Sequence, residues 1–168
     1  MGTYTNLYLR VPILSDHAPS EIVSDLQNIS KGRFPCQAPP QKRAIGQDDN
    51  CFLDSDWAVA SDHELFKLPF YDWWKVFWGQ NCDEDNFGTK YDGKMLEIRS
   101  EFKNYDGQID LVLDWLKPAV CTRKKVLWIG FRKREDFHPK INLYRHQDQS
   151  INDFKTWENH SISGRHTP

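Results

Sequence analysis

Hydrophobic and polar residues alternate in several short segments of this chain, which is the pattern of strands with one buried face. The alternation runs through residues 4–14 and 95–103, and two further strands are predicted over 125–133 and 139–145. The segment Tyr91-Asp92-Gly93-Lys94 predicts a hairpin leading into the strand at 95–103, because Asp-Gly tolerates the positive φ of a type I′ turn.

Apolar residues at helical spacing occupy stretches between these strands. One helix is predicted before Gly32, with an apolar face formed by Ile22, Val23, Leu26 and Ile29. Another is predicted before Pro118, with an apolar face formed by Ile109, Val112, Leu113 and Leu116. Residues 61–79 predict a short helix that Pro69 interrupts, and they form the most aromatic part of the chain.

The predicted order of elements is strand, helix, insertion, strand, strand, helix, strand, strand. This order predicts an α+β fold with a ferredoxin-like (split βαβ) antiparallel sheet, helices on one face and an extra C-terminal strand. The long insertion after the first helix covers the aromatic-rich residues 35–90. Residues 1–146 are therefore expected to form a single domain, and residues 147–168 a polar C-terminal tail.

Composition and charge limit the function classes. The chain has 168 residues, of which 39% are hydrophobic and 27% charged, with a formal net charge of −2. It has no run of about 18 apolar residues and no secretory signal pattern, so we expect a cytoplasmic protein without a membrane partner. The four cysteines lack the close spacing of a zinc site, and the aspartates around Asp54-Ser55-Asp56 lack the pattern of a calcium loop. No metal or cofactor is expected.

Aromatic side chains in residues 66–78 cover more than one side of a helix. Aromatic residues are common anchors of protein interfaces, because each buries a large area at a small cost in rotamer entropy. Charge is also uneven, with an acidic excess in residues 1–90 and a basic excess in residues 91–168. The leading hypothesis is a non-enzymatic accessory protein of the immunity or inhibitor kind. It would bind another protein, or a second copy of itself, through Phe70, Trp73, Trp74 and Trp78.

The segment Asp49-Asn50-Cys51-Phe52-Leu53 resembles the surroundings of the nucleophile in papain-like cysteine hydrolases. The resemblance implies that Cys51 is a thiolate nucleophile and that its base is one of three histidines, His63, His138 or His146. The aspartates close to Cys51 in sequence act against this role, because negative neighbours raise the pKa of a thiol. A cysteine-dependent hydrolase is therefore the first alternative to a binding protein.

Basic residues gather in the segment 123–134, where Trp128 and Phe131 are interleaved with them. Single-stranded nucleic acid is bound by this combination, because cations neutralise phosphates and flat rings stack on bases. The second alternative is a weak binder of single-stranded RNA or DNA. Its predicted contacts are Arg123, Lys124, Lys125, Arg132, Lys133 and Arg134.

Overall fold

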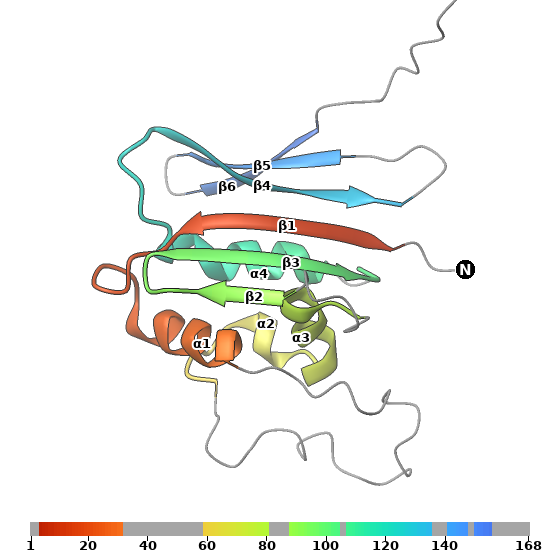
Figure 1. Ribbon diagram of the computed structural model, residues 1–168, viewed down its shortest axis with the longest axis horizontal. Helices are drawn as coiled ribbons and strands as arrows, with labels where there is room; N and C mark the ends of the chain where they lie inside the picture. Colours follow the sequence, from red (N-terminus) through yellow and green to blue (C-terminus); the bar gives the residue numbers. More distant parts are fainter. Residues whose placement is uncertain are drawn as a thin grey trace, which may run out of the picture.

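Six strands form one antiparallel sheet in the order β2-β3-β1-β4-β5-β6 (Figure 1). The computed structural model describes residues 4–31, 59–80, 88–104, 107–135, 141–147 and 150–155. The strands are β1 (Thr5–Pro12), β2 (Gly88–Tyr91), β3 (Met95–Phe102), β4 (Val126–Arg134), β5 (Ile141–Gln147) and β6 (Ser150–Lys155). The helices are α1 (Ser20–Lys31), α2 (Glu64–Lys67), α3 (Phe70–Trp78), α4 (Gln108–Leu116) and the short 3₁₀ helix η3 (Lys117–Ala119).

The α+β class and the antiparallel sheet predicted from the sequence are confirmed, but the sheet is larger than predicted. β6 lies within the segment predicted to be a polar tail, and it pairs with β5 from Ser150, opposite Gln147, onward. Backbone hydrogen bonds join one strand to the next and need no apolar side chains, so the polar composition of this segment gave no signal. The predicted interruption at Pro69 is confirmed, because Pro69 separates α2 from α3.

One face of the sheet carries the core. Leu7, Leu9 and Val11 of β1 are buried, whereas the residues between them are half-buried or exposed, and β3 alternates in the same way. The described helices pack on this face: α4 lies behind β1 and β3 in Figure 1, and α1 and α3 contact β2. None of the described helices packs on the opposite face, which bears Tyr8 and Arg10, and this face is called the uncovered face below.

The tryptophans of α3 belong largely to the core. Trp73 and Trp74 are 3% and 4% exposed, and Trp78 is half-buried. The indole Nε1 of Trp78 donates to the carbonyl oxygen of Ile29 at 3.1 Å and so ties α3 to α1. The burial of Trp73 and Trp74 corrects their expected place on a docking surface, because an apolar side chain inside its own domain cannot anchor a partner. The side chain of Phe70 lies outside the described part of the structure.

Two hydroxyl groups from the sheet hold the end of α3. The Ser100 hydroxyl donates to the carbonyl oxygen of Val76 at 2.6 Å, and the Thr89 hydroxyl donates to that of Phe77 at 2.7 Å. The last carbonyl groups of a helix have no N–H donor within the helix. The two hydroxyl groups supply the missing donors. These two hydrogen bonds explain why Thr89 and Ser100, which are polar, are tolerated on the core face of β2 and β3.

The β2–β3 hairpin forms where it is predicted, with its tip one residue later. Tyr91 pairs with Leu96, so Gly93 and Lys94 occupy the tip rather than Asp92 and Gly93. The Asp92 carboxylate accepts hydrogen bonds from the backbone N–H of Met95 at 2.8 Å and of Lys94 at 2.9 Å. Both bonds favour the charged form and lower the pKa of Asp92.

Replacing Asp92 with alanine is expected to lower the melting temperature at neutral pH, because two turn N–H groups lose their acceptor. The pKa of Asp92 is lower in the folded than in the unfolded chain. Its contribution is therefore complete above the ordinary value of about 3.9 and is lost as the pH falls through the lowered pKa. Melting curves of wild type and Asp92→Ala should converge in that acid range. Asp92→Asn keeps an acceptor oxygen and should retain part of the stability at neutral pH, whereas equal melting of wild type and Asp92→Ala there would contradict the expectation.

Candidate functional site

Aromatic rings lie at the centre of the uncovered face. Tyr8 of β1 is directly opposite Phe131 of β4, and their ring centroids are 5.8 Å apart. Phe131 is 37% exposed and Trp128, also in β4, is 54% exposed. These rings therefore offer flat apolar surfaces to a ligand in solution.

Three cation–aromatic pairs lie on the same face. The charged group is 5.2, 5.3 and 5.9 Å from the ring centroid in the pairs Arg99–Tyr8, Lys103–Tyr4 and Arg145–Trp128. A cation is attracted to the face of an aromatic ring by the electron density above it. The Nε of Arg99 is also 2.9 Å from a carboxylate oxygen of Glu97, which helps to hold the guanidinium group in place.

Basic residues outnumber acidic residues on this face. Directly paired residues in antiparallel strands point to the same side, so the register assigns each side chain to a face. Among the described residues of this face, the basic ones are Arg10, Lys90, Arg99, Lys103, Lys133 and Arg145, and the acidic ones are Glu97, Glu101 and Glu135. The uncovered face is therefore locally positive, although the whole chain has a net charge of −2.

A shallow depression of about 330 Å³ lies between β1, β3 and β4, lined in part by Asn6, Tyr8, Arg99 and Phe131. The amide Nδ2 of Asn6 donates to a carboxylate oxygen of Glu135 at 3.1 Å, which orients the amide group. The depression thus combines aromatic walls with amide and guanidinium groups. Such a surface can stack on a planar ring and form hydrogen bonds to its edge.

The six basic residues predicted to contact nucleic acid do not share one surface. Lys133 pairs with Asn6 and faces the uncovered side. Arg132 points to the helices, where its guanidinium group is 3.9 Å from the Asp110 carboxylate, and Arg134 faces the same way. The other three are exposed in the turn before β4: Arg123, Lys124 and Lys125. The period of two in a strand separates side chains that are consecutive in sequence.

Two of the four candidate catalytic residues lie in the described part of the chain. His63 precedes α2, where its Nδ1 accepts from the backbone N–H of Leu65 at 3.1 Å and its Nε2 is 3.2 Å from the Asp114 carboxylate. His146 is buried in β5. Cys51 and His138 lie outside the described residues, so the cysteine hydrolase stays a prediction. Both ring nitrogens of His63 already have structural partners.

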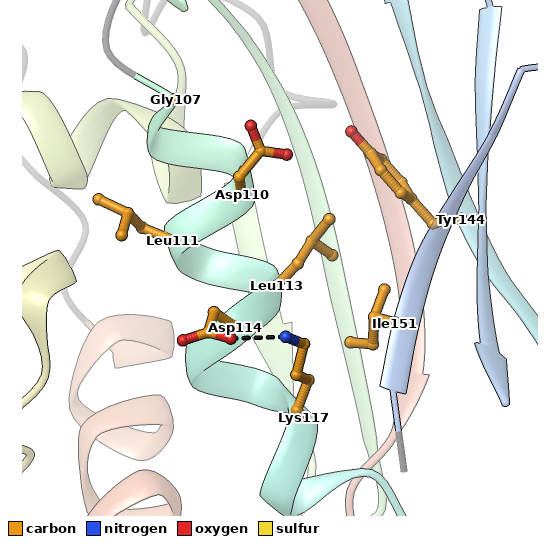
Figure 2. A pocket seen from close by; sticks show the side chains of 8 residues that line it. All are labelled: Gly107, Asp110, Leu111, Leu113, Asp114, Lys117, Tyr144 and Ile151. Carbon is orange, nitrogen blue, oxygen red and sulfur yellow. Dashed lines mark hydrogen bonds and ion pairs between the residues drawn. The ribbon is translucent and has the colours of Figure 1, made fainter. Parts of the chain in front are cut away.

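A second hollow of about 480 Å³ lies between α4 and the strands β5 and β6, on the core side of the sheet (Figure 2). Leu113 of α4 and Tyr144 of β5 extend into it from opposite sides. The Asp114 carboxylate at its rim accepts a hydrogen bond from Lys117 Nζ at 2.6 Å. The contacts of Asp114 with Lys117 and His63 lower the pKa of Asp114. Opposite charges therefore compensate each other at this rim, in contrast to the positive excess on the uncovered face.

Within the described ranges, no group of three or more His, Cys, Asp or Glu side chains is arranged to hold a metal ion. None of the helices described here has the apolar length that crossing a bilayer requires. The chain matches no protein-family model, and comparisons with curated proteins and with solved structures found no similar protein. The features of this chain that bear on its function are therefore the geometry and chemistry of the uncovered face.

Three residues of this face, Tyr8, Arg99 and Arg145, are missing from the sequence prediction. The sequence carries one signal for Tyr8, since the alternation in residues 4–14 puts it on the polar side of a strand. It carries none for the partners of Tyr8, because β1, β3 and β4 are distant in sequence and become neighbours only through the strand order.

Proposed function

We propose that this protein binds single-stranded nucleic acid on the uncovered face of its sheet, with a base stacked at Tyr8 and Phe131. We call these two residues the first stacking site. The observation that carries the proposal is that the half-buried ring of Tyr8 and the exposed ring of Trp128 each lie beside a guanidinium group on one sheet face, where Phe131 is also exposed. Unpaired bases stack on aromatic rings and guanidinium planes, whereas phosphates are neutralised by Lys and Arg. A duplex hides the faces of its bases, so this surface suits an unpaired strand.

The distribution of charge supports the same face. Among the exposed charged residues described on α1 to α4 and in the segment before α2, acidic residues outnumber basic ones: Glu21, Asp62, Glu64, Asp110 and Asp114 against Lys31 and Lys67. Two of these acidic residues, Glu64 and Asp114, are paired with Lys67 and Lys117. A polyanion is therefore attracted more strongly to the sheet side than to the helical side, which orients it as it approaches. A net charge of −2 for the whole chain is compatible with local binding of this kind.

We also infer that β1 to β4, with α1 and α4 as their connections, follow the ferredoxin-like plan. In this plan α2 and α3 belong to the insertion, and β5 and β6 are additions at one edge. The order β2-β3-β1-β4 within the sheet supports this inference. It makes β1 a central strand, so Tyr8 has Arg99 as its partner on one side and Phe131 on the other.

The proposal is tested by fluorescence anisotropy with labelled oligouridylate and oligothymidylate of about ten nucleotides, a length within known site sizes. Both strands should bind at low salt. Raising the salt from about 50 to about 200 mM should weaken binding by roughly twentyfold if three phosphates are neutralised. The relative affinities of the two strands then show whether RNA or DNA is preferred. Absence of binding to both, or affinity that does not change with salt, would overturn the proposal.

Replacing Lys133 with alanine is expected to weaken binding several-fold and to reduce the steepness of the salt dependence by about 0.7, because one phosphate contact with a single strand is lost. Arg134→Ala is the matched control: it removes the next cation in the same strand, but one that faces the helices. Its affinity should stay close to that of the wild type. An equal loss in both variants, with melting curves unchanged, would indicate general charge attraction rather than binding on the uncovered face.

A further inference from the structure

Trp128 reaches the uncovered face because β4 contains a bulge. The register between β4 and β5 shifts between Trp128 and Gly130, so that Ile129 is an extra residue in the ladder. In a regular strand, residues three apart point to opposite faces, and Trp128 would then face the helices while Phe131 faces away from them. The bulge instead leaves Ile129 buried at 1% exposure, and both Trp128 and Phe131 are exposed.

The surroundings of Trp128 repeat the chemistry of the first stacking site. Arg145 of β5 pairs directly with Trp128, and its guanidinium group lies over the indole ring. Arg99 lies over Tyr8 in the same manner from β3. Two ring–guanidinium pairs thus lie on one face, on either side of Phe131 in the sheet.

We infer that Trp128 and Arg145 form a second stacking site, so that two consecutive bases of one strand are held at once. The inference rests on the proposed function. Along β4, Trp128 and Phe131 are separated by about two regular residue steps, or roughly 7 Å, once the bulge is discounted. Aromatic residues on other open four-stranded sheets stack two or three bases of one strand. The bulge is therefore a positioning device that converts a site for one base into a site for two.

The test uses two strands of about ten nucleotides. The one-base strand carries a single base and is abasic elsewhere, and the two-base strand carries two adjacent bases. The second base should raise the affinity of the wild type by about tenfold, because each stacked base contributes on this scale. In Trp128→Ala this gain should vanish, while the one-base strand binds as it does to the wild type. Trp128→Phe keeps a stacking ring and should restore most of the gain, which a merely structural role of the side chain would not predict.

Controls separate the failure of this inference from failure of the proposed function. Tyr71→Ala removes an exposed aromatic ring on α3, 38% exposed in the wild type, and should leave both affinities unchanged. One outcome would overturn the second stacking site alone. In it, the wild type binds normal strands and Phe131→Ala binds them more weakly, but a second base does not raise the affinity of the wild type. Wild type that binds no strand at all would overturn the proposed function together with this inference.

Discussion

Replacing Gly130 with alanine is expected to destabilise the protein by about 4 kcal/mol, from overpacking and backbone strain together. A Cβ at this position would lie 2.0 Å from the carbonyl oxygen of Tyr8 and 2.9 Å from the Cα of Leu9. Both contacts are with the backbone of β1, which is paired on both sides with β3 and β4 and cannot move away from the methyl group. The φ of 152° adds strain for any residue with a side chain.

Gly107→Ala is the matched control for this prediction. Gly107 also has a positive φ, 69°, but a Cβ there would meet nothing closer than a carboxylate oxygen of Asp110 at 3.7 Å. Gly107→Ala should therefore lower the free energy of unfolding by about 1 kcal/mol, which is the cost of the positive φ alone. Urea unfolding of the wild type and both variants gives the two costs under the same conditions. Equal costs would contradict the close approach of β4 to β1 at the bulge.

The second large effect is expected from Asp25→Ala, at about 3 kcal/mol. The Asp25 side chain is 1% exposed, and its two carboxylate oxygens accept from the backbone N–H of Ala60 at 2.6 Å and of Ser61 at 2.9 Å. Alanine would leave both N–H groups without an acceptor in a partly buried place. The loss should extend further, because the Ser61 hydroxyl accepts from the indole Nε1 of Trp115 in α4 at 3.1 Å. Asp25 thus connects α1 to α4 through residues 59–63.

Ser24→Ala, at the exposed neighbour of Asp25 in α1, should change the free energy of unfolding by less than about 0.5 kcal/mol. Asp25→Asn keeps one acceptor oxygen but turns an amide N–H toward the other donor, so its cost should lie close to that of alanine. Urea unfolding measures all three variants. A cost for Asp25→Ala near that of Ser24→Ala would mean that the contact with residues 60 and 61 does not stabilise the fold.

Local pattern was sufficient for most of the elements. The alternation of Leu7, Leu9 and Val11 with polar neighbours specified β1 and its buried face, and helical spacing specified α1 and α4. Pro69 separated two helices as predicted, because proline cannot donate the hydrogen bond that a continuous helix needs. These features depend on residues within a few positions of one another. β6 escaped prediction because its strand is defined by pairing with β5 rather than by its own apolar pattern.

The candidate site depended on contacts between distant segments. Burial of Trp73 and Trp74 followed from where α3 packs, and no spacing within residues 66–78 distinguishes a core tryptophan from an exposed one. The side to which Trp128 points was decided by a bulge, which changes the face of a side chain without changing the composition of the strand. The sequence alone determined that the chain forms half-buried strands and amphipathic helices, because those patterns are short-range. Only the tertiary structure decided that Tyr8 and Trp128 meet arginines from β3 and β5 on the face that also bears Phe131, because strand order and register arise from pairing across the whole chain.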